Sequence, residues 1–123
     1  LAIRRGVKIA VGCDLFVSHE FGYNGRELEY LTVMGMTPLQ AIEAATANGA
    51  DILGPQAPLS GQLKEGYDAD VILLSQNPLQ DIAVLGDPKK VTSVWKAGIL
   101  VKPFTATPGP AGRAYAFWDQ STA

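Results

Sequence analysis

The first strongly apolar stretch of the chain is residues 7–11, which lies between Gly6 and Gly12. A short run that is apolar at nearly every position is typical of a strand covered on both faces. Asp14 follows directly at the C-terminal end of this run. We therefore expect a buried strand that ends just before a carboxylate.

The next periodic stretch has the start and stop signals of a helix. Asn24 is a good N-cap, and Glu27 stands three residues later, as in a capping box. Leu28, Leu31 and Met34 fall on one face of the predicted helix. Gly35 is expected to end it.

A second helix is predicted to start immediately afterwards. Thr37 has the features of its N-cap, Pro38 of its first position and Gln40 of its third position. Small apolar residues give this helix a narrow face that can pack closely. Asn48-Gly49 is expected to break it, and residues 50–53 are expected to add one helical turn before Gly54.

From Gln56 onward the pattern changes to short strands and turns. A buried strand is predicted over 71–74, and a loop or helical turn over 77–85. Two further strands, 91–95 and 99–101, flank Ala97-Gly98 in a tight hairpin. Residues 103–123 have the composition of an extended tail. We expect its aromatic residues to cover an apolar patch of the protein itself, and the alternative is that they anchor the tail on a neighbouring surface; these are Tyr115, Phe117 and Trp118.

The predicted strand over 7–11 has no partner of its own type in this sequence. A buried parallel strand needs neighbours on both sides. The chain also opens with Leu1-Ala2-Ile3-Arg4-Arg5-Gly6, which has the pattern of a helix end closed by a glycine. We therefore expect the chain to be part of a larger protein.

Composition excludes several classes of protein. Of the 123 residues, 47% are hydrophobic and 18% are charged, which is a globular composition. The net charge of −2 gives no basic surface for phosphates, so we expect no nucleic-acid partner. No apolar run approaches the roughly 20 residues of a membrane helix, so we expect no membrane partner. One cysteine allows no internal disulfide and leaves the redox compartment open.

Asp14 is the first candidate for chemistry. In a parallel α/β barrel, side chains at the C-terminal ends of the strands form the active site. A carboxylate in that place can bind a cation or take a proton from water. The structural alternative is an ordinary loop or capping aspartate, and position alone does not separate the two.

An ordered set of short motifs favours the functional interpretation of Asp14 over an ordinary loop or capping aspartate. In the first half these are Gly12-x-Asp14, His19, Asn24, Glu27-Leu28, Gly35-Met36-Thr37-Pro38-x-x-Ala41 and Ala44-Ala45-Thr46-x-Asn48-x-Ala50-x-x-Leu53-Gly54. In the second half they are Gly61-x-Leu63-x-x-Gly66-x-x-Ala69-Asp70-x-x-x-Leu74, Asn77-Pro78-Leu79-x-Asp81-Ile82 and Val91-x-x-Val94-x-Lys96-x-Gly98. Over about residues 5–102, the order of these motifs resembles the C-terminal part of the amidohydrolase superfamily. The imidazolonepropionase-like or prolidase-like branch is the most similar.

The resemblance implies an α/β fold. Residues 1–55 would be the last strand and helices of a (β/α)8 TIM-type barrel. Residues 56–102 would be the C-terminal strands of a small β-sandwich, and 103–123 the tail. It also implies a centre with one or two divalent metal ions, zinc first among them. Family ligands include histidines from other strands and a final aspartate, and Asp14 is the one position here that matches. Its implied roles are metal ligand and catalytic proton shuttle.

Two neighbours of Asp14 depart from the family pattern. Cys13 stands where relatives usually have Thr or Ser, so the resemblance implies that the residue supporting the metal ligand is a weaker hydrogen-bond donor. Cys13 as a nucleophile is the competing interpretation, although no partner base is evident. His19 stands where relatives often have a His-Gly pair, so it is a candidate substrate contact or a loop histidine bonded to backbone. Asn48 and Asp70 are interpreted as structural residues, the latter bonding to turn amides.

Three hypotheses follow. In the first, the chain is part of a metal-dependent hydrolase that cleaves an amide, imide or C-terminal peptide bond, and is inactive without the rest of the barrel. Its partners would then be that missing N-terminal chain, a small-molecule or peptide-like substrate and a second copy in a homo-oligomer. In the second, the chain is a non-catalytic relative that serves association. In the third, it is an independent small α/β protein.

Overall fold

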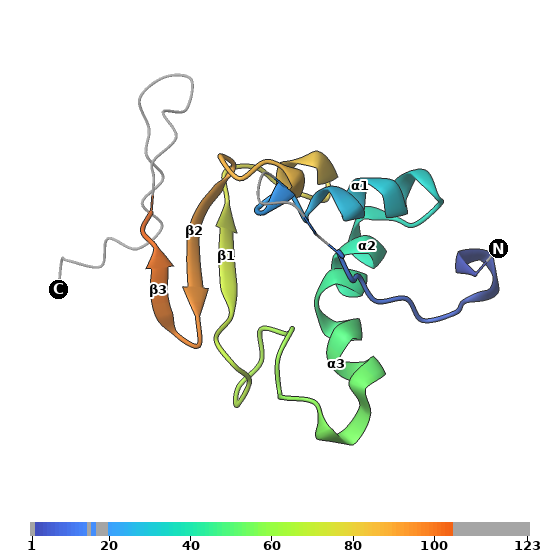
Figure 1. Ribbon diagram of the computed structural model, residues 1–123, viewed down its shortest axis with the longest axis horizontal. Coiled ribbons are helices and arrows are strands. Elements are labelled where there is room, and N and C mark those ends of the chain that lie inside the picture. Colours follow the sequence, from blue (N-terminus) through green and yellow to red (C-terminus); the bar gives the residue numbers. More distant parts are fainter. Residues whose placement is uncertain (1, 15, 17–19, 105–123) are drawn as a thin grey trace, which may run out of the picture.

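The computed structural model describes residues 2–14, 16 and 20–104. Figure 1 shows a small sheet on one side of the molecule and a group of helices on the other. The elements are η1 (Ile3–Arg5), α1 (Arg26–Val33), α2 (Pro38–Ala45), α3 (Ala47–Leu53), η3 (Gly54–Gln56), β1 (Val71–Leu74), η4 (Ile82–Gly86), β2 (Val91–Lys96) and β3 (Ile99–Lys102). Within the described part of the chain, no helix is long and apolar enough to cross a bilayer.

The core lies among the helices. Leu28 and Leu31 of α1 are buried against Ala41 and Ala44 of α2. The two alanines are almost completely buried, at 0% and 1% exposure, because small side chains let the helices approach closely. Partly buried apolar residues surround this cluster; they are Ile9, Val11, Met36, Ile42, Ile82 and Leu85. Segments on either side of the helices, residues 9–11 and η4, therefore contribute to the same core.

The start of α2 forms as predicted. Thr37 Oγ1 accepts the backbone N–H of Gln40 at 3.2 Å, and Gln40 Oε1 accepts the N–H of Thr37 at 2.9 Å. This reciprocal capping box satisfies two N–H groups that the first helical turn leaves free. The predicted end of α1 is also confirmed, since Gly35 has a φ of 111° directly after the helix.

Two predicted helix boundaries are wrong. The N-cap of α1 is Gly25 and makes no side-chain cap, so the expected Asn24 capping box is absent from the described structure. The break after α2 falls at Thr46, with φ −130° and ψ −90°, whereas Asn48 and Gly49 lie inside α3. Asn48 is tolerated in the helix because its side chain bonds to another segment and not to the local backbone.

The three strands form one antiparallel sheet in the order β1-β2-β3. Val71 faces Trp95 in the first pair, and Trp95 faces Leu100 in the second. The predicted hairpin is confirmed: Ala97 and Gly98 join β2 and β3 with φ values of 49° and 76°. Positive φ at both central residues matches the right-handed twist of a two-residue hairpin. The predicted turn before the hairpin is also present, as η4.

The strand expected over 7–11 is not formed. These residues are outside any sheet, and Val7 is 56% exposed, so the segment is not covered on both faces. The reason is physical: a strand needs a neighbouring strand for its backbone groups, and none of the described strands lies beside it. The helices hold the segment instead. Of the tail, only Pro103 and Phe104 are described, so Tyr115, Phe117 and Trp118 lie outside the described residues.

Candidate functional site

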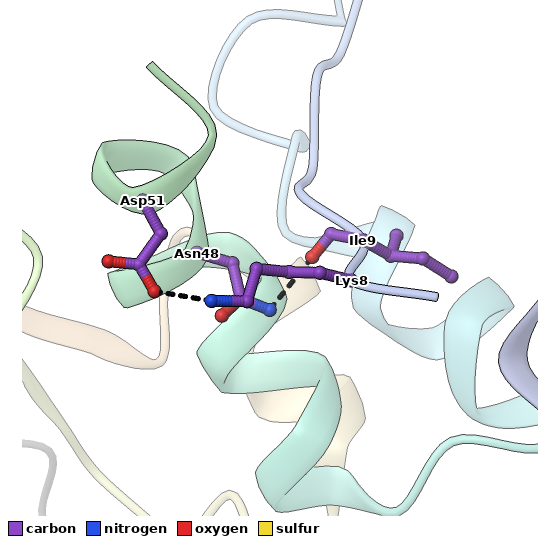
Figure 2. Close-up of polar contacts among 4 residues, drawn as sticks. All are labelled: Lys8, Ile9, Asn48 and Asp51. Carbon is purple, nitrogen blue, oxygen red and sulfur yellow. Dashed lines mark hydrogen bonds and ion pairs between the residues drawn. The ribbon is translucent and has the colours of Figure 1, made fainter. Parts of the chain in front are cut away.

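The segment that leads to Asp14 is attached to α2 and α3. The backbone N–H of Val11 donates to the carbonyl oxygen of Ala44 at 2.9 Å. Nδ2 of Asn48 donates to the carbonyl oxygen of Ile9, also at 2.9 Å. Figure 2 shows this contact beside the ion pair between Lys8 and Asp51, whose Nζ and Oδ2 atoms are 2.7 Å apart. The interpretation of Asn48 as a structural residue is therefore confirmed.

Apolar packing adds to these polar contacts. Ile9 and Val11 are half-buried and pack against the helical core. Lys8, which forms the ion pair with Asp51 of α3, is exposed. Because the two apolar side chains are two positions apart, they can lie on the same side of an extended backbone. Residues 9–11 are thus held against the helices by hydrogen bonds and apolar packing, three residues before Asp14.

Asp14 itself is exposed and makes no hydrogen bond or ion pair with the described residues. A carboxylate that has no partner among the described residues, at the end of a fixed segment, is available to a cation or to a reacting water. In the described part of the chain, no three His, Cys, Asp or Glu side chains lie together in a way that could hold a metal ion. Asp14 can therefore supply one ligand to a metal, while a zinc site in a protein needs three or four.

The Cys13 side chain contacts the backbone just before α1. Its thiol is half-buried, and Sγ donates to the carbonyl oxygen of Asn24 at 3.4 Å. Burial raises the pKa of the Cys13 thiol above its ordinary value, and the negative charge of Glu27 raises it further. A raised pKa keeps the sulfur protonated at neutral pH, which disfavours Cys13 as a nucleophile. The thiol links the residue before Asp14 to α1.

The structure gives a different outcome for each of the other residues considered in the sequence. His19, the predicted substrate contact, lies outside the described residues. Glu27 is half-buried and acts on the Cys13 thiol through its charge. Asp70 bonds to the turn amide of Ala97, which confirms its structural interpretation. The bond from Asn48 to Ile9 spans 39 positions of sequence, and no local pattern could have revealed that partner.

An open depression lies elsewhere on the described surface. It lies between α1 and η4, and the guanidinium of Arg26 stands over the Tyr23 ring there, 4.7 Å from its centroid. Its charged lining contains both signs, with Lys89 opposed by Glu29 and Asp87. Neither Cys13 nor Asp14 lines it. We therefore assign the candidate chemistry to Asp14 and not to this depression.

Comparison with known proteins gives one consistent result. The chain is 55% identical to ochratoxinase of Aspergillus niger over 102 residues, which are 82% of this chain and 21% of that protein. It is 33% identical to imidazolonepropionase of Deinococcus deserti over 101 residues, which are 80% of this chain and 25% of that protein.

Solved structures agree. The A. niger ochratoxinase crystal structure has a TM-score of 0.74 at 54% identity, over 83% of this chain and 23% of that chain. A Xaa-Pro dipeptidase with methionine bound in its active site has a TM-score of 0.71 at 37% identity, over 82% of this chain and 24% of that chain. The chain thus spans about a fifth to a quarter of the length of these relatives.

The model of the amidohydrolase family matches residues 1–101, which is most of the chain. This match confirms the resemblance that the ordered motifs indicated. The chain belongs to the amidohydrolase family.

Proposed function

We propose that this chain is the C-terminal part of a metal-dependent hydrolase that cleaves a C–N bond with an activated water. The observation that carries the proposal is the exposed carboxylate of Asp14, which has no partner among residues 2–14, 16 and 20–104. It stands at the end of a segment fixed to two helices, in a chain of the amidohydrolase family. The bond would be an amide, an imide or a C-terminal peptide bond, as the names of the relatives suggest.

The donor type of Asp14 fits a divalent ion. Carboxylate oxygens bind zinc at about 2.0–2.2 Å, and a bound zinc lowers the pKa of its water to about 7. Asp14 would bind the ion through one oxygen and accept the proton of the attacking water with the other. The same carboxylic acid would then return that proton to the leaving nitrogen.

The remaining ligands would come from the rest of the protein. We propose that residues 7–14 form the last strand of a (β/α)8 barrel once the neighbouring strands are present. The strands β1–β3 would belong to a small β-sandwich. Exposed apolar side chains on both halves support this: Val33 is 85% exposed and Leu63 is 87% exposed. Surfaces of that kind are typical of faces that another part of the protein covers.

The test uses the full-length protein that contains this chain. Bound metal would be measured by mass spectrometry, and hydrolysis would be followed with Xaa-Pro dipeptides and N-acyl amino acids, with and without a chelator. We expect at least one divalent ion per chain and a chelator-sensitive activity. Asp14→Asn should lower kcat/KM by a factor of about 100 or more, since it removes a proton acceptor and a charged ligand. Asp51→Asn, on the exposed ion pair, is the matched control.

A full-length protein with no metal and no hydrolysis would contradict the proposal, as would an Asp14→Asn variant with unchanged activity. The second candidate is a non-catalytic association module. Exposed apolar residues on the edge strand β3 favour it, since Ile99 is 69% exposed and Val101 is 59% exposed. An intact-mass measurement from the natural source separates the two. A species three to four times larger supports the enzyme, and a 13 kDa product without a partner supports the module.

A further inference from the structure

We propose that Asn48 is a positioning residue that fixes the segment carrying Asp14. This inference rests on the proposed function. Asn48 lies in the first turn of α3, is half-buried, and donates from Nδ2 to the carbonyl oxygen of Ile9 at 2.9 Å. Figure 2 shows the amide reaching from the helix to the backbone of the other segment.

Asn48 differs from the other side chain that joins these two elements. The ion pair between Lys8 and Asp51 is about half exposed at both ends, with side-chain exposures of 54% and 49%. Exposed pairs of this kind contribute little because water and salt screen them. The amide of Asn48, in contrast, bonds to a backbone carbonyl in a partly buried place, where a lost partner is felt more strongly.

Asn48 also stands where helix stability alone would favour another residue. Asn is a weaker helix former than Ala, and Gly49 beside it weakens the helix further. Within the described structure, the contact with Ile9 is the role that accounts for an amide at this position. It acts together with the bond from Val11 to Ala44, so that two backbone groups of the segment are held two residues apart.

Fixing these two groups sets the position of the segment along the helices. A slip by one residue would move the chain by about 3.3 Å and turn each side chain to the opposite side. A metal ligand must stay within about 0.2 Å of its bonding distance. The bond from Asn48 therefore holds Asp14 in reach of a metal without contact to the metal or to substrate.

The experiment again uses the full-length protein. Asn48→Ala removes the donor, and Asn48→Asp keeps the side-chain size but places an acceptor opposite the Ile9 carbonyl. The matched control is Asp51→Asn, which breaks the exposed ion pair to the same segment. Four quantities would be measured: the zinc Kd by competition with a chelator, kcat, KM, and hydrogen exchange of the amides in residues 7–14.

We expect both Asn48 variants to weaken zinc binding about tenfold, as outer contacts of metal ligands commonly do. They should also lower kcat about tenfold, change KM less than about threefold, and speed exchange at Val11. For Asp51→Asn, the zinc Kd, kcat, KM and the exchange rate at Val11 should each stay within about twofold of the wild-type value. The Kd is informative because the apparent Kd rises only by the inverse of the folded fraction, so a variant that stays mostly folded cannot show a tenfold change from destabilisation alone.

Two failures are distinguishable. If the wild-type protein binds no metal and hydrolyses nothing, the proposed function fails. The exchange data then decide the inference alone: faster exchange in Asn48→Ala than in Asp51→Asn supports the anchor, and equal exchange overturns it. If the wild-type protein is active and both Asn48 variants keep its zinc Kd and kcat, the inference is overturned, even where their melting temperature falls.

Discussion

The carboxylate of Asp70 accepts the backbone N–H of Ala97, with Oδ1 and the amide nitrogen 2.8 Å apart. Its other oxygen pairs with Nζ of Lys96 at 2.5 Å. The residue before β1 is thereby tied to the turn between β2 and β3. The N–H of Gly98 completes the junction by donating to the carbonyl of Ala69 at 3.0 Å. Asp70 thus links the start of β1 to the β2–β3 turn by two side-chain contacts.

The first prediction concerns the pH dependence of this junction. The hydrogen bond from Lys96, followed by that from Ala97, holds the pKa of Asp70 below its ordinary value of about 3.9. The hydrogen bond with Asp70 raises the pKa of Lys96. A lowered acid pKa stabilises the folded state above about pH 4, and this contribution is lost as pH falls through the folded-state pKa. A raised lysine pKa stabilises it below about pH 10, and this contribution is lost as pH rises further.

Asp70→Asn should therefore flatten both the acid and the alkaline decline in the free energy of unfolding, measured in urea between pH 3 and pH 11. Asp68→Asn is the control, because Asp68 acts on Lys96 through its charge alone. If the two variants have the same pH profile, the junction does not carry the effect.

The second prediction concerns the backbone of the same turn. Ala97 has a φ of 49°, a conformation that costs a residue with a Cβ about 1 kcal/mol relative to glycine. Ala97→Gly should therefore raise the free energy of unfolding by about 0.5–1 kcal/mol. Gly98→Ala should lower it by a similar amount, since Gly98 has a φ of 76°. Thermal unfolding of the two variants should give opposite shifts, and shifts of the same sign would contradict this account of the turn.

The third prediction concerns the contact between α1 and η4. A Cβ built on Gly25 would lie 1.9 Å from the carbonyl oxygen of Leu85, which is backbone and cannot turn away. Gly25→Ala should therefore destabilise the fold by about 2 kcal/mol or more, because α1 must move off η4. Gly49→Ala is the matched control inside α3, with nothing within 4 Å of its Cβ. It should stabilise by up to about 1 kcal/mol through helix propensity. Equal effects in chemical denaturation would rule out the close approach.

The sequence was most informative where local chemistry decides the structure. The capping box of Thr37 and Gln40 and the Ala97-Gly98 turn each depend on residues a few positions apart, so their patterns were sufficient. The N-terminus of α1 could not be predicted in the same way. Gly25 begins that helix, and it lies against the carbonyl of Leu85, 60 positions later in the chain. A contact at that distance leaves no local pattern.

In the candidate site, too, local features could be predicted and contacts with distant segments could not. Asp14 could be found from its place after an apolar run and from the ordered motifs around it. Its support could not, because the anchors of the segment come from α2 and α3, more than 30 positions away. The predicted strand over 7–11 failed for a related reason. Apolar residues make a segment suitable for a sheet, but a strand also needs a partner, and none of the described strands lies beside residues 7–11.

The last prediction separates the two interpretations of Cys13. It is the one cysteine of the chain, so alkylation with iodoacetamide reports on it alone. Because its pKa is raised, the reactive thiolate should be scarce at pH 7, and the alkylation rate should rise steeply only above about pH 8.5. Fast alkylation at pH 7 would show an activated thiol and would favour the nucleophile.

Substitution then tests the role of the thiol in the full-length protein. Cys13→Ser keeps a donor for the carbonyl of Asn24, whereas Cys13→Ala removes it. If the thiol only supports the backbone beside Asp14, the serine variant should keep hydrolysis within about threefold, and the alanine variant should lose about threefold to tenfold. A nucleophilic sulfur requires a different result, since Cys13→Ala would then abolish turnover while zinc remained bound. Measuring metal content and kcat on the same samples distinguishes these outcomes, because a support role lowers both quantities together and a nucleophile lowers only the rate.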